Sequence, residues 1–261
     1  MRGIIVCTKV VPKSEDLTFD QETMTLKREG AENQLNEADK NAIEFAVKVR
    51  ERYGGKVTLL SMGPMLFEPL LKLGIAMGAD DAVLLSAREF AGGDSFATSM
   101  VLAAGIRKIG DYDLVVLGEE SSDGGTGQVP SQVAELLDLP QILYVSKADL
   151  GEGKITATRS VRGGHEVAEG SLPALVSVEL GVNQPRFPDF RRKRWAETEF
   201  KLTVWNASDL GLNPEEIGLK GSYTSVLRLT EFPTPERRRE FVEGTDEEKA
   251  ARIAEILKAQ Q

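Results

Sequence analysis

The sequence predicts an α/β protein with a mostly parallel sheet flanked by helices, because short apolar, β-rich runs alternate with segments of helical periodicity. Six such runs are present, at residues 3–11, 57–62, 81–85, 114–117, 141–145 and 174–179. The chain has 261 residues, of which 41% are apolar, so it can form one large domain or a domain with an appendage.

Four segments between these runs have the length and apolar spacing of crossover helices, at residues 35–53, 67–77, 95–109 and 129–137. In the first, apolar residues from Ala42 to Val49 recur at i, i+3, i+4 spacing, with charged residues on the opposite face. Asp94 stands just before the third, where a short oxygen side chain accepts bonds from the free N–H groups of the first turn.

The pattern changes after the alternating region. Residues 154–170 alternate polar and apolar residues around Gly163-Gly164, which predicts a β-hairpin. From residue 181 the composition is that of a connector with few apolar residues to pack, and it contains the basic cluster 191–194. Residues 247–258 predict a helix with one narrow apolar stripe, which we expect to pack on a partner or another domain.

Composition excludes several kinds of function. The formal net charge of -9, from 32 basic and 41 acidic residues, argues against a nucleic-acid binder, because an acidic surface repels phosphate. One cysteine, Cys7, forms no internal disulfide, and one histidine, His165, leaves the usual zinc and Ser-His or Cys-His sites without partners. No apolar run has the length of a membrane helix, and residues 3–7 are too short for a signal peptide. We expect a cytoplasmic protein with no metal site, no direct membrane insertion and no catalytic side chain.

The strongest local signal is residues 114–132, where a buried strand runs into a loop of small and hydroxylic residues and then into a helix. Such loops in α/β sheets present backbone N–H groups and a positive helix end to phosphate. The glycines allow a close approach, and Thr126, Gln128 and Ser131 are able to donate to phosphate oxygens. A plain βα turn is the alternative, because glycine-rich loops are common for conformational reasons alone.

A second loop of small residues, 92–99, opens another helix at the carboxyl end of a strand, and two such loops are suited to flank one elongated ligand. Its plain alternative is a capped helix start. Lys9, at the end of the first strand, is placed to meet a phosphate or a partner's carboxylate, or is simply a surface lysine. Cys7 lies in an apolar run, which favours a buried structural thiol.

Together these segments resemble the β subunit of electron-transfer flavoproteins (the family that includes FixA) from Ile4 to about Lys258, and its electron-bifurcating group in particular. The matching pieces are Val6-Cys7-Thr8-Lys9-Val10-Val11-Pro12, Asn36-Glu37-Ala38-Asp39, Ser61-Met62-Gly63-Pro64, 73–80, 118–132, Leu139-Pro140-Gln141 and 183–187 before a basic stretch.

The resemblance implies a flavodoxin-like or adenine-nucleotide α-hydrolase-like sheet, with a C-terminal arm that embraces a larger, FAD-holding α subunit. It implies a nucleotide-binding domain at 1–185, a basic recognition loop and connector at 186–232, and a helical arm on the partner subunit at 233–261. Phe190 and Arg191 lie at the positions that dock a dehydrogenase. In this family the β subunit binds AMP in ordinary members and a second FAD in bifurcating ones.

By the same resemblance the ligand lies against Cys7, Asn36, Glu37, Ala38, Asp39, Met62, Glu120, Ser121, Ser122, Asp123, Gly124, Gly125, Thr126, Gly127, Gln128, Val129, Ser131 and Gln132. Residues 93–99 resemble the Ala-Asp-Thr-x-Ala-Thr-Ser motif of bifurcating members, which adds Asp94, Ser95 and Thr98. Lys9 joins the set because of its place at the end of the first strand. The departures are Gly125, where an acidic residue is usual, and Pro130-Ser131 for Gly-Pro.

The bifurcating reading implies that hydride passes from NADH to a flavin held here, with one electron going to a high-potential path and the other to ferredoxin or flavodoxin. The high-potential partner would be a dehydrogenase or quinone reductase, and NADH oxidation would occur only within a complex. One alternative is a non-bifurcating β subunit that binds AMP structurally and docks acyl-CoA-type dehydrogenases. Another is a universal-stress-like nucleotide-binding protein acting alone, which the basic connector and C-terminal helix disfavour.

Overall fold

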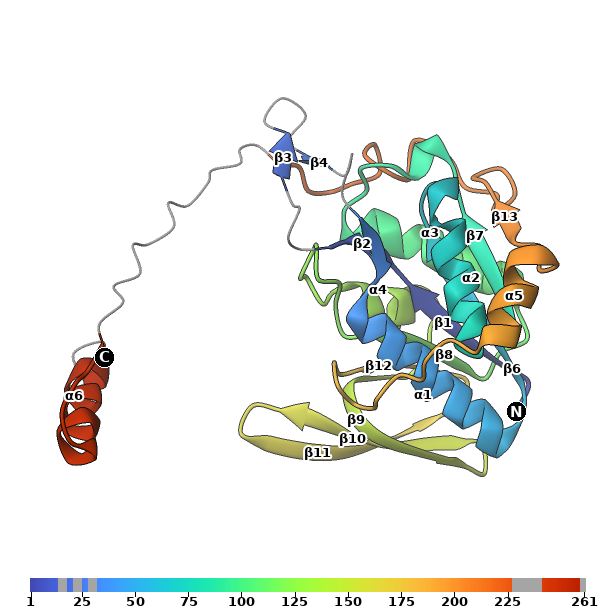
Figure 1. Cartoon of the computed structure of the whole chain (residues 1–261). Helices are drawn as coiled ribbons and strands as arrows, with labels where there is room; N and C mark the ends of the chain where they lie inside the picture. Colours follow the sequence, from blue (N-terminus) through green and yellow to red (C-terminus); the bar gives the residue numbers. More distant parts are fainter. Residues whose placement is uncertain (14–17, 21–24, 28–31, 227–240, 259–261) are drawn as a thin grey trace. The chain divides into compact units, whose positions relative to one another are not determined.

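The computed structural model describes residues 1–13, 18–20, 25–27, 32–226 and 241–258. Its main sheet has nine strands in the order β11-β10-β9-β12-β8-β1-β6-β7-β13 (Figure 1). They are β1 (Gly3–Thr8), β6 (Lys56–Met62), β7 (Asp81–Leu85), β8 (Leu114–Gly118), β9 (Gln141–Gly151), β10 (Lys154–Val161), β11 (Gly164–Ser171), β12 (Ala174–Val178) and β13 (Thr203–Trp205). The seven neighbouring strands β9-β12-β8-β1-β6-β7-β13 all pair in parallel, and only β10 and β11 are antiparallel. The predicted α/β class with a mostly parallel sheet is therefore confirmed.

Helices cover both faces of the central strands. The helices that connect them are α1 (Glu37–Tyr53), α2 (Glu68–Ala76), α3 (Ser95–Ile109) and α4 (Val129–Leu136), with short 3-10 turns η2 (Met65–Phe67) and η3 (Arg88–Phe90). Along β1, Ile4 and Val6 belong to the core under α1, whereas Ile5 belongs to the core under α3 and α4. Strands buried on both faces need continuous apolar runs, which is why the runs read so clearly in the sequence.

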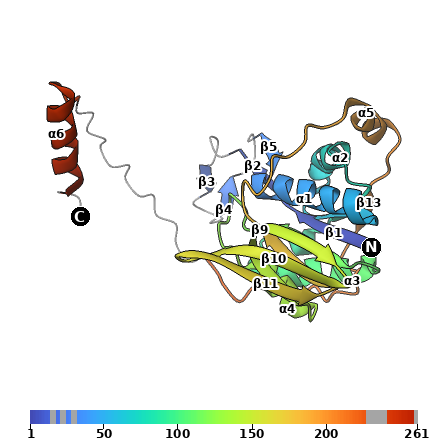
Figure 2. The same cartoon turned by 90° about the horizontal axis from the view of Figure 1, so that it is seen from below.

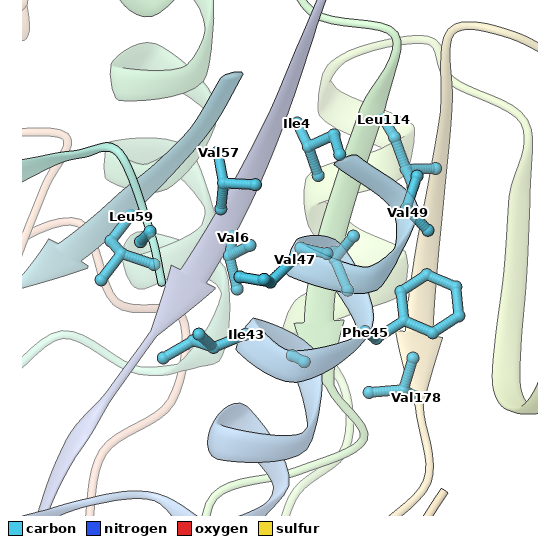
Figure 3. Packing of buried hydrophobic residues seen from close by; sticks show 14 of the residues in the cluster. Ile4, Val6, Ile43, Phe45, Val47, Val49, Val57, Leu59, Leu114 and Val178 are labelled. Atoms are coloured by element: carbon cyan, nitrogen blue, oxygen red, sulfur yellow. The ribbon is translucent and has the colours of Figure 1, made fainter. Parts of the chain in front are cut away.

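Helix α1 supplies much of the first core. Figure 3 shows Ile43 and Val47 pointing from α1 toward the side chains of β1 and β6, with Phe45 toward β12. All of these side chains are buried. The i, i+3, i+4 pattern of the sequence therefore corresponds to the face that packs on the sheet.

Strand order reverses beside β1. The chain passes from β1 through α1 to β6 and through α2 to β7, and α3 then returns it to β8 on the other side of β1. The loops that leave the carboxyl ends of β1 and β8 therefore diverge, and the edge between them, here called the crevice, is where doubly wound sheets bind their ligands.

The predicted hairpin is confirmed and forms part of a larger extension. Strands β10 and β11 pair antiparallel, and β10 also pairs with β9, which continues well beyond the predicted residue 145. Figure 2 shows these three strands together as one layer.

The expected single strand at 3–11 is wrong. The main-sheet strand ends at Thr8, and β2 (Val10–Pro12) pairs instead with β5 (Asn33–Leu35) in a separate two-stranded sheet. Lys9 lies at the break between them because its backbone N–H is bonded to a side chain rather than to the sheet. A second small sheet contains β3 (Thr18–Asp20) and β4 (Thr25–Lys27).

The expectation that little packs in the basic connector is also wrong. Residues 190–198 form α5 (Phe190–Thr198), in which Ala196 is fully buried, and β13 extends the main sheet beside β7. Arg192 explains much of the docking, because its Nε donates to the Ile75 carbonyl at the end of α2 and its guanidinium also bonds Ala79 O. Basic residues near the last carbonyls of a helix satisfy its free acceptors.

The chain divides into two compact units, residues 1–227 and 228–261. The second contains α6 (Asp246–Lys258), whose start is fixed by reciprocal bonds between Thr245 and Glu248. Its stripe residues Ile253 and Leu257 are exposed. The predicted boundary between 232 and 233 lies outside the described residues. Within those residues no helix is long and apolar enough to cross a membrane.

Close packing of α1 on β8 depends on Gly118. A β-carbon there would lie 2.5 Å from Asp39 Oδ1 and 2.7 Å from Ala38 Cβ, and 2.8 Å from the backbone carbon of Ala38. Backbone atoms cannot swing aside as the tip of a side chain can.

We therefore expect Gly118→Ala to lower the free energy of unfolding by about 1–3 kcal/mol, the usual cost of overpacking. Urea denaturation measures this. Gly151→Ala is the matched control, because a β-carbon at Gly151 meets nothing within 4 Å, and it should change stability by less than about 0.5 kcal/mol. Equal effects of the two substitutions would contradict the packing argument.

Candidate functional site

A buried carboxylate joins the two loops at the reversal of strand order. Asp39 lies in the first turn of α1; its Oδ2 accepts from the Lys9 backbone N–H at 2.7 Å and its Oδ1 from the Gly118 N–H at 3.2 Å. Lys9 follows β1 directly, and Gly118 ends β8. Asp39 therefore fixes the directions in which both loops leave the sheet.

Burial dominates the electrostatics of this point. It raises the pKa of Asp39 to about 7, although hydrogen bonds from the Lys9 and Gly118 N–H groups act in the opposite direction. Burial, with the nearby Asp39 carboxylate, also raises the pKa of the Cys7 thiol. Cys7 is thus a neutral, buried thiol, as the sequence predicted.

Asn36 holds the loop after β8 against the start of α1. It occupies the N-cap position of α1, but its side chain makes no capping hydrogen bond to the backbone of the helix. Its Nδ2 instead donates to Glu120 O at 2.8 Å, and its Oδ1 accepts from the Ser122 N–H at 3.1 Å. Residues 36–39 therefore hold both the loop after β1 and the loop after β8 by hydrogen bonds.

Lys9 and Asp123 form the second link across the crevice. Lys9 Nζ lies 2.5 Å from Asp123 Oδ1 and donates to Ser121 Oγ at 3.1 Å. The Asp123 side chain is 3% exposed, whereas that of Lys9 is 42% exposed. The aspartate is thus sealed in the loop, and part of the lysine remains open to solvent.

The starts of α3 and α4 lie side by side. Ser95 Oγ donates to Gln128 Oε1 at 2.8 Å, and Ser99 Oγ donates to Gln132 Oε1 at 3.0 Å. The Ser131 hydroxyl donates to Gln128 O and closes the first turn of α4. Two helix starts therefore meet at the carboxyl edge of the sheet, and that of α4, which no side chain caps, keeps free N–H groups that suit an anion.

Glycines shape the loop between these two regions. Gly125 and Gly127 have φ of 56° and 61°, in the left-handed region that glycine adopts without strain. Gly124 packs beside Ser121, and Gly127 lies near the Tyr144 hydroxyl.

The remaining predicted site residues lie around these groups. Ala38 packs against Gly118, Glu37 pairs with Lys40 at the surface, and Met62 is partly buried beside the second core. The others are Asp94 and Thr98 in the start of α3, Glu120 and Thr126 in the loop, and Val129 at the start of α4.

Phe190 and Arg191 lie elsewhere. They open α5, whose preceding Asp189 N–H bonds Ala76 O at the end of α2. Because α2 runs back from the carboxyl edge, this end lies at the amino edge of the sheet, opposite to the loops above. Phe190 is 78% exposed there.

Sequence reasoning missed three groups that bear on the site. Ser222 and Thr224 hydrogen bond Asp94, and Tyr144 borders Gly127. None of these residues stands in a motif, and their contacts span long sequence separations, so no local signal could have found them. Among the residues that the structure describes, no cluster of His, Cys, Asp or Glu is suited to hold a metal.

The reversed strand order, with a glycine-containing loop running into a helix at the carboxyl edge, defines a doubly wound α/β protein of the kind that binds ligands at that edge. The electron transfer flavoprotein domain matches residues 23–209, and the chain belongs to this family. The electron transfer flavoprotein subunit beta of Thermoanaerobacterium thermosaccharolyticum is 40% identical over 255 residues, 98% of this chain and 97% of that protein.

Two further relatives come from other bacteria. The caffeyl-CoA reductase-Etf complex subunit CarD of Acetobacterium woodii is 41% identical over 226 residues, covering 86% of each chain. Protein FixA of Azotobacter vinelandii is 37% identical over 253 residues, covering 93% of this chain and 88% of that protein. The expected resemblance is thereby confirmed.

The raised pKa of Asp39 predicts a pH-dependent stability. Folded Asp39 keeps its proton to about pH 7, whereas an unfolded aspartate loses it near pH 4. Its contribution to the free energy of unfolding is therefore largest below about pH 4 and is lost as the pH rises to about 7. We compare the free energy of unfolding of the wild type with that of Asp39→Asn. The advantage of the wild type should fall between about pH 4 and pH 7, by about 1.4 kcal/mol for each unit by which the two pKa values differ, and should stay constant above about pH 7.

Urea denaturation at a series of pH values measures this difference. Asp113→Asn is a control of opposite sign: burial raises the pKa of Asp113, but hydrogen bonds from Arg2 outweigh it, so the pKa is lowered. Its contribution should be present above about pH 4 and be lost at lower pH. A flat or rising difference for Asp39 between pH 4 and 7 would be incompatible with its burial as an acid.

Proposed function

We propose that this chain is the β subunit of a heterodimeric electron-transfer flavoprotein, that it binds FAD in the cytoplasm, and that it takes hydride from NADH for flavin-based electron bifurcation. The pair of joined helix starts carries the proposal. The uncapped start of α4 offers N–H groups, and the adjoining start of α3 brings the Ser95 hydroxyl beside it, so that the pair suits a diphosphate better than a single phosphate group. The similarity to a subunit of a caffeyl-CoA reductase-Etf complex supports the same reading.

The residues present fit such a ligand. Lys9 offers a partly exposed ammonium at the crevice, and the hydroxyl of Ser95 and the loop residue Thr126 lie at the helix starts. The left-handed glycines let the backbone approach an anion closely. Bound FAD would carry out the chemistry, which is acceptance of hydride and transfer of single electrons. The chain would bind the flavin, orient it and tune its reduction potential.

The side chains of the site have positioning roles in this proposal. Asp39 and Asn36 hold the loops after β1 and β8 in register, while Asp123 directs the Lys9 ammonium along the crevice. Among the described site residues none need act as an acid, base or nucleophile. Phe190 and Arg191, at the opposite edge, would dock a dehydrogenase or quinone reductase, and ferredoxin or flavodoxin would take the low-potential electron.

A second candidate is a non-bifurcating β subunit that holds AMP structurally. Gly125 and Pro130-Ser131 differ from the motif of bifurcating members and lie in the loop that would contact the diphosphate. These differences support AMP as the alternative ligand. The two functions differ in the bound nucleotide.

The flavin and AMP content of the purified heterodimer, measured after acid release by chromatography, separates the two. We expect two FAD and no AMP per heterodimer. One FAD with one AMP would replace the proposal by the structural alternative. Absence of any nucleotide beyond the FAD of the α subunit would exclude both.

Asp123→Ala should weaken nucleotide retention roughly tenfold, which corresponds to about 1.4 kcal/mol, a modest loss for a pair whose carboxylate is buried and whose lysine is partly exposed. The loss follows from freeing Lys9 and loosening the loop. The control is Glu135→Ala, which removes one exposed negative charge from α4 and should leave the nucleotide content unchanged. Unchanged retention in Asp123→Ala would refute the assignment of this loop.

A further inference from the structure

The segment that leads to the C-terminal unit is fastened to the loop that opens α3. Residues 213–226, here called the strap, end just before the second unit begins at residue 228. Ile217 of the strap is 1% exposed and belongs to the core under α3 and α4. The Leu219 N–H donates to Ala91 O at 3.0 Å, and the Leu219 side chain covers Gly92. The strap therefore packs on the residues that precede α3.

Asp94 bonds the helix and the strap at once. Its Oδ1 accepts from the Ala97 N–H at 2.9 Å, which caps α3. Its Oδ2 accepts from both the N–H and the Oγ1 of Thr224, each at 3.0 Å. The Asp94 N–H donates to Ser222 Oγ at 2.8 Å, so three hydrogen bonds join one residue to the strap.

Neighbouring rings strengthen the same junction. The rings of Phe96 and Tyr223 pack edge to face with centroids 5.2 Å apart. Ser222 is fixed in turn, because its hydroxyl donates to Gly218 O at 2.8 Å. The contact is therefore a built junction between two segments about 130 residues apart in the sequence.

A helix cap alone does not account for this use of Asp94. Capping needs one carboxylate oxygen, and the second accepts from the N–H and the hydroxyl of Thr224. Burial raises the pKa of Asp94, but the hydrogen bonds from Ala97 and Thr224 outweigh it and lower the pKa, which keeps the carboxylate charged. A charged acceptor with both oxygens occupied is poorly suited to touch a diphosphate directly.

We propose that Asp94 is a positioning residue that holds the strap against the helix start that receives the nucleotide. The nucleotide part of this inference rests on the proposed function, whereas the junction itself does not. Asp94 acts through the next residue, Ser95, whose hydroxyl joins α3 to α4. Loosening the strap should therefore weaken nucleotide retention although no strap residue lies in the assigned ligand site.

Asp94→Asn tests the junction selectively. Asparagine caps a helix as well as aspartate does, so the bond to Ala97 is kept, but its NH2 group cannot accept from the Thr224 N–H. Hydrogen exchange followed by mass spectrometry, on the full chain in its purified complex, should rise roughly tenfold in peptides covering 216–226, because hydrogen bonds to a charged acceptor are among the stronger ones. Exchange in 94–99 should change less than about twofold.

Asp189→Asn is the matched control, because Asp189 caps α5 through the Arg192 N–H in the same way and should leave 216–226 unchanged. Unchanged exchange of the strap in Asp94→Asn would overturn the inference. So would an equal rise in both segments, since Asp94 would then be only a cap.

Thr224→Val tests the coupling to the nucleotide, because it removes a strap hydroxyl outside the assigned ligand site. We expect a severalfold lower nucleotide content in both Thr224→Val and Asp94→Asn. A loosened strap with unchanged nucleotide content would overturn the coupling. Wild-type protein without nucleotide on this chain would instead refute the proposed function, and the exchange result would still stand or fall on its own.

Discussion

The arrangement of the site depends on one buried carboxylate at the point where strand order reverses. Asp39 ties the backbone at the ends of β1 and β8 to the first turn of α1, and it can do so only because Gly118 lets α1 approach β8 closely. Both loops of the crevice start from these two bonds. Since burial disfavours the charged form, the protein keeps at its centre an acid whose protonation changes near neutral pH.

The proposed nucleotide-binding site and the proposed partner-docking site lie at opposite edges of the sheet. Parallel strands bring all their following loops to the carboxyl edge, so Lys9, Asp123 and the starts of α3 and α4 meet there. Helix α5 instead docks on the far end of α2, where Arg192 satisfies the last carbonyls and Phe190 is left exposed. A partner docked at α5, as proposed, would therefore leave the carboxyl edge free for a ligand.

Much of the fold was readable from the sequence because its central strands are buried on both faces and its helices are strongly periodic. The break in the strand at Lys9 could not be predicted, because the apolar run continues through it. Only the bond from the Lys9 N–H to the Asp39 side chain interrupts the hydrogen bonding of the sheet there. Helix α5 and β13 were missed for a related reason. Their docking rests on Arg192 and on the edge of β7, and neither gives an apolar pattern.

The sequence by itself determined the α/β class, the crossover helices, the hairpin and the two small-residue loops, because each depends on local periodicity or on turn residues. It also carried the resemblance that named the family. Only the tertiary structure decided that Asn36 bonds the loop after β8, that Lys9 pairs with Asp123, and that Asp94 holds the strap. These are contacts between residues some 80 to 130 positions apart, and hydrogen-bond geometry at such separations is set by the folded chain rather than by local sequence.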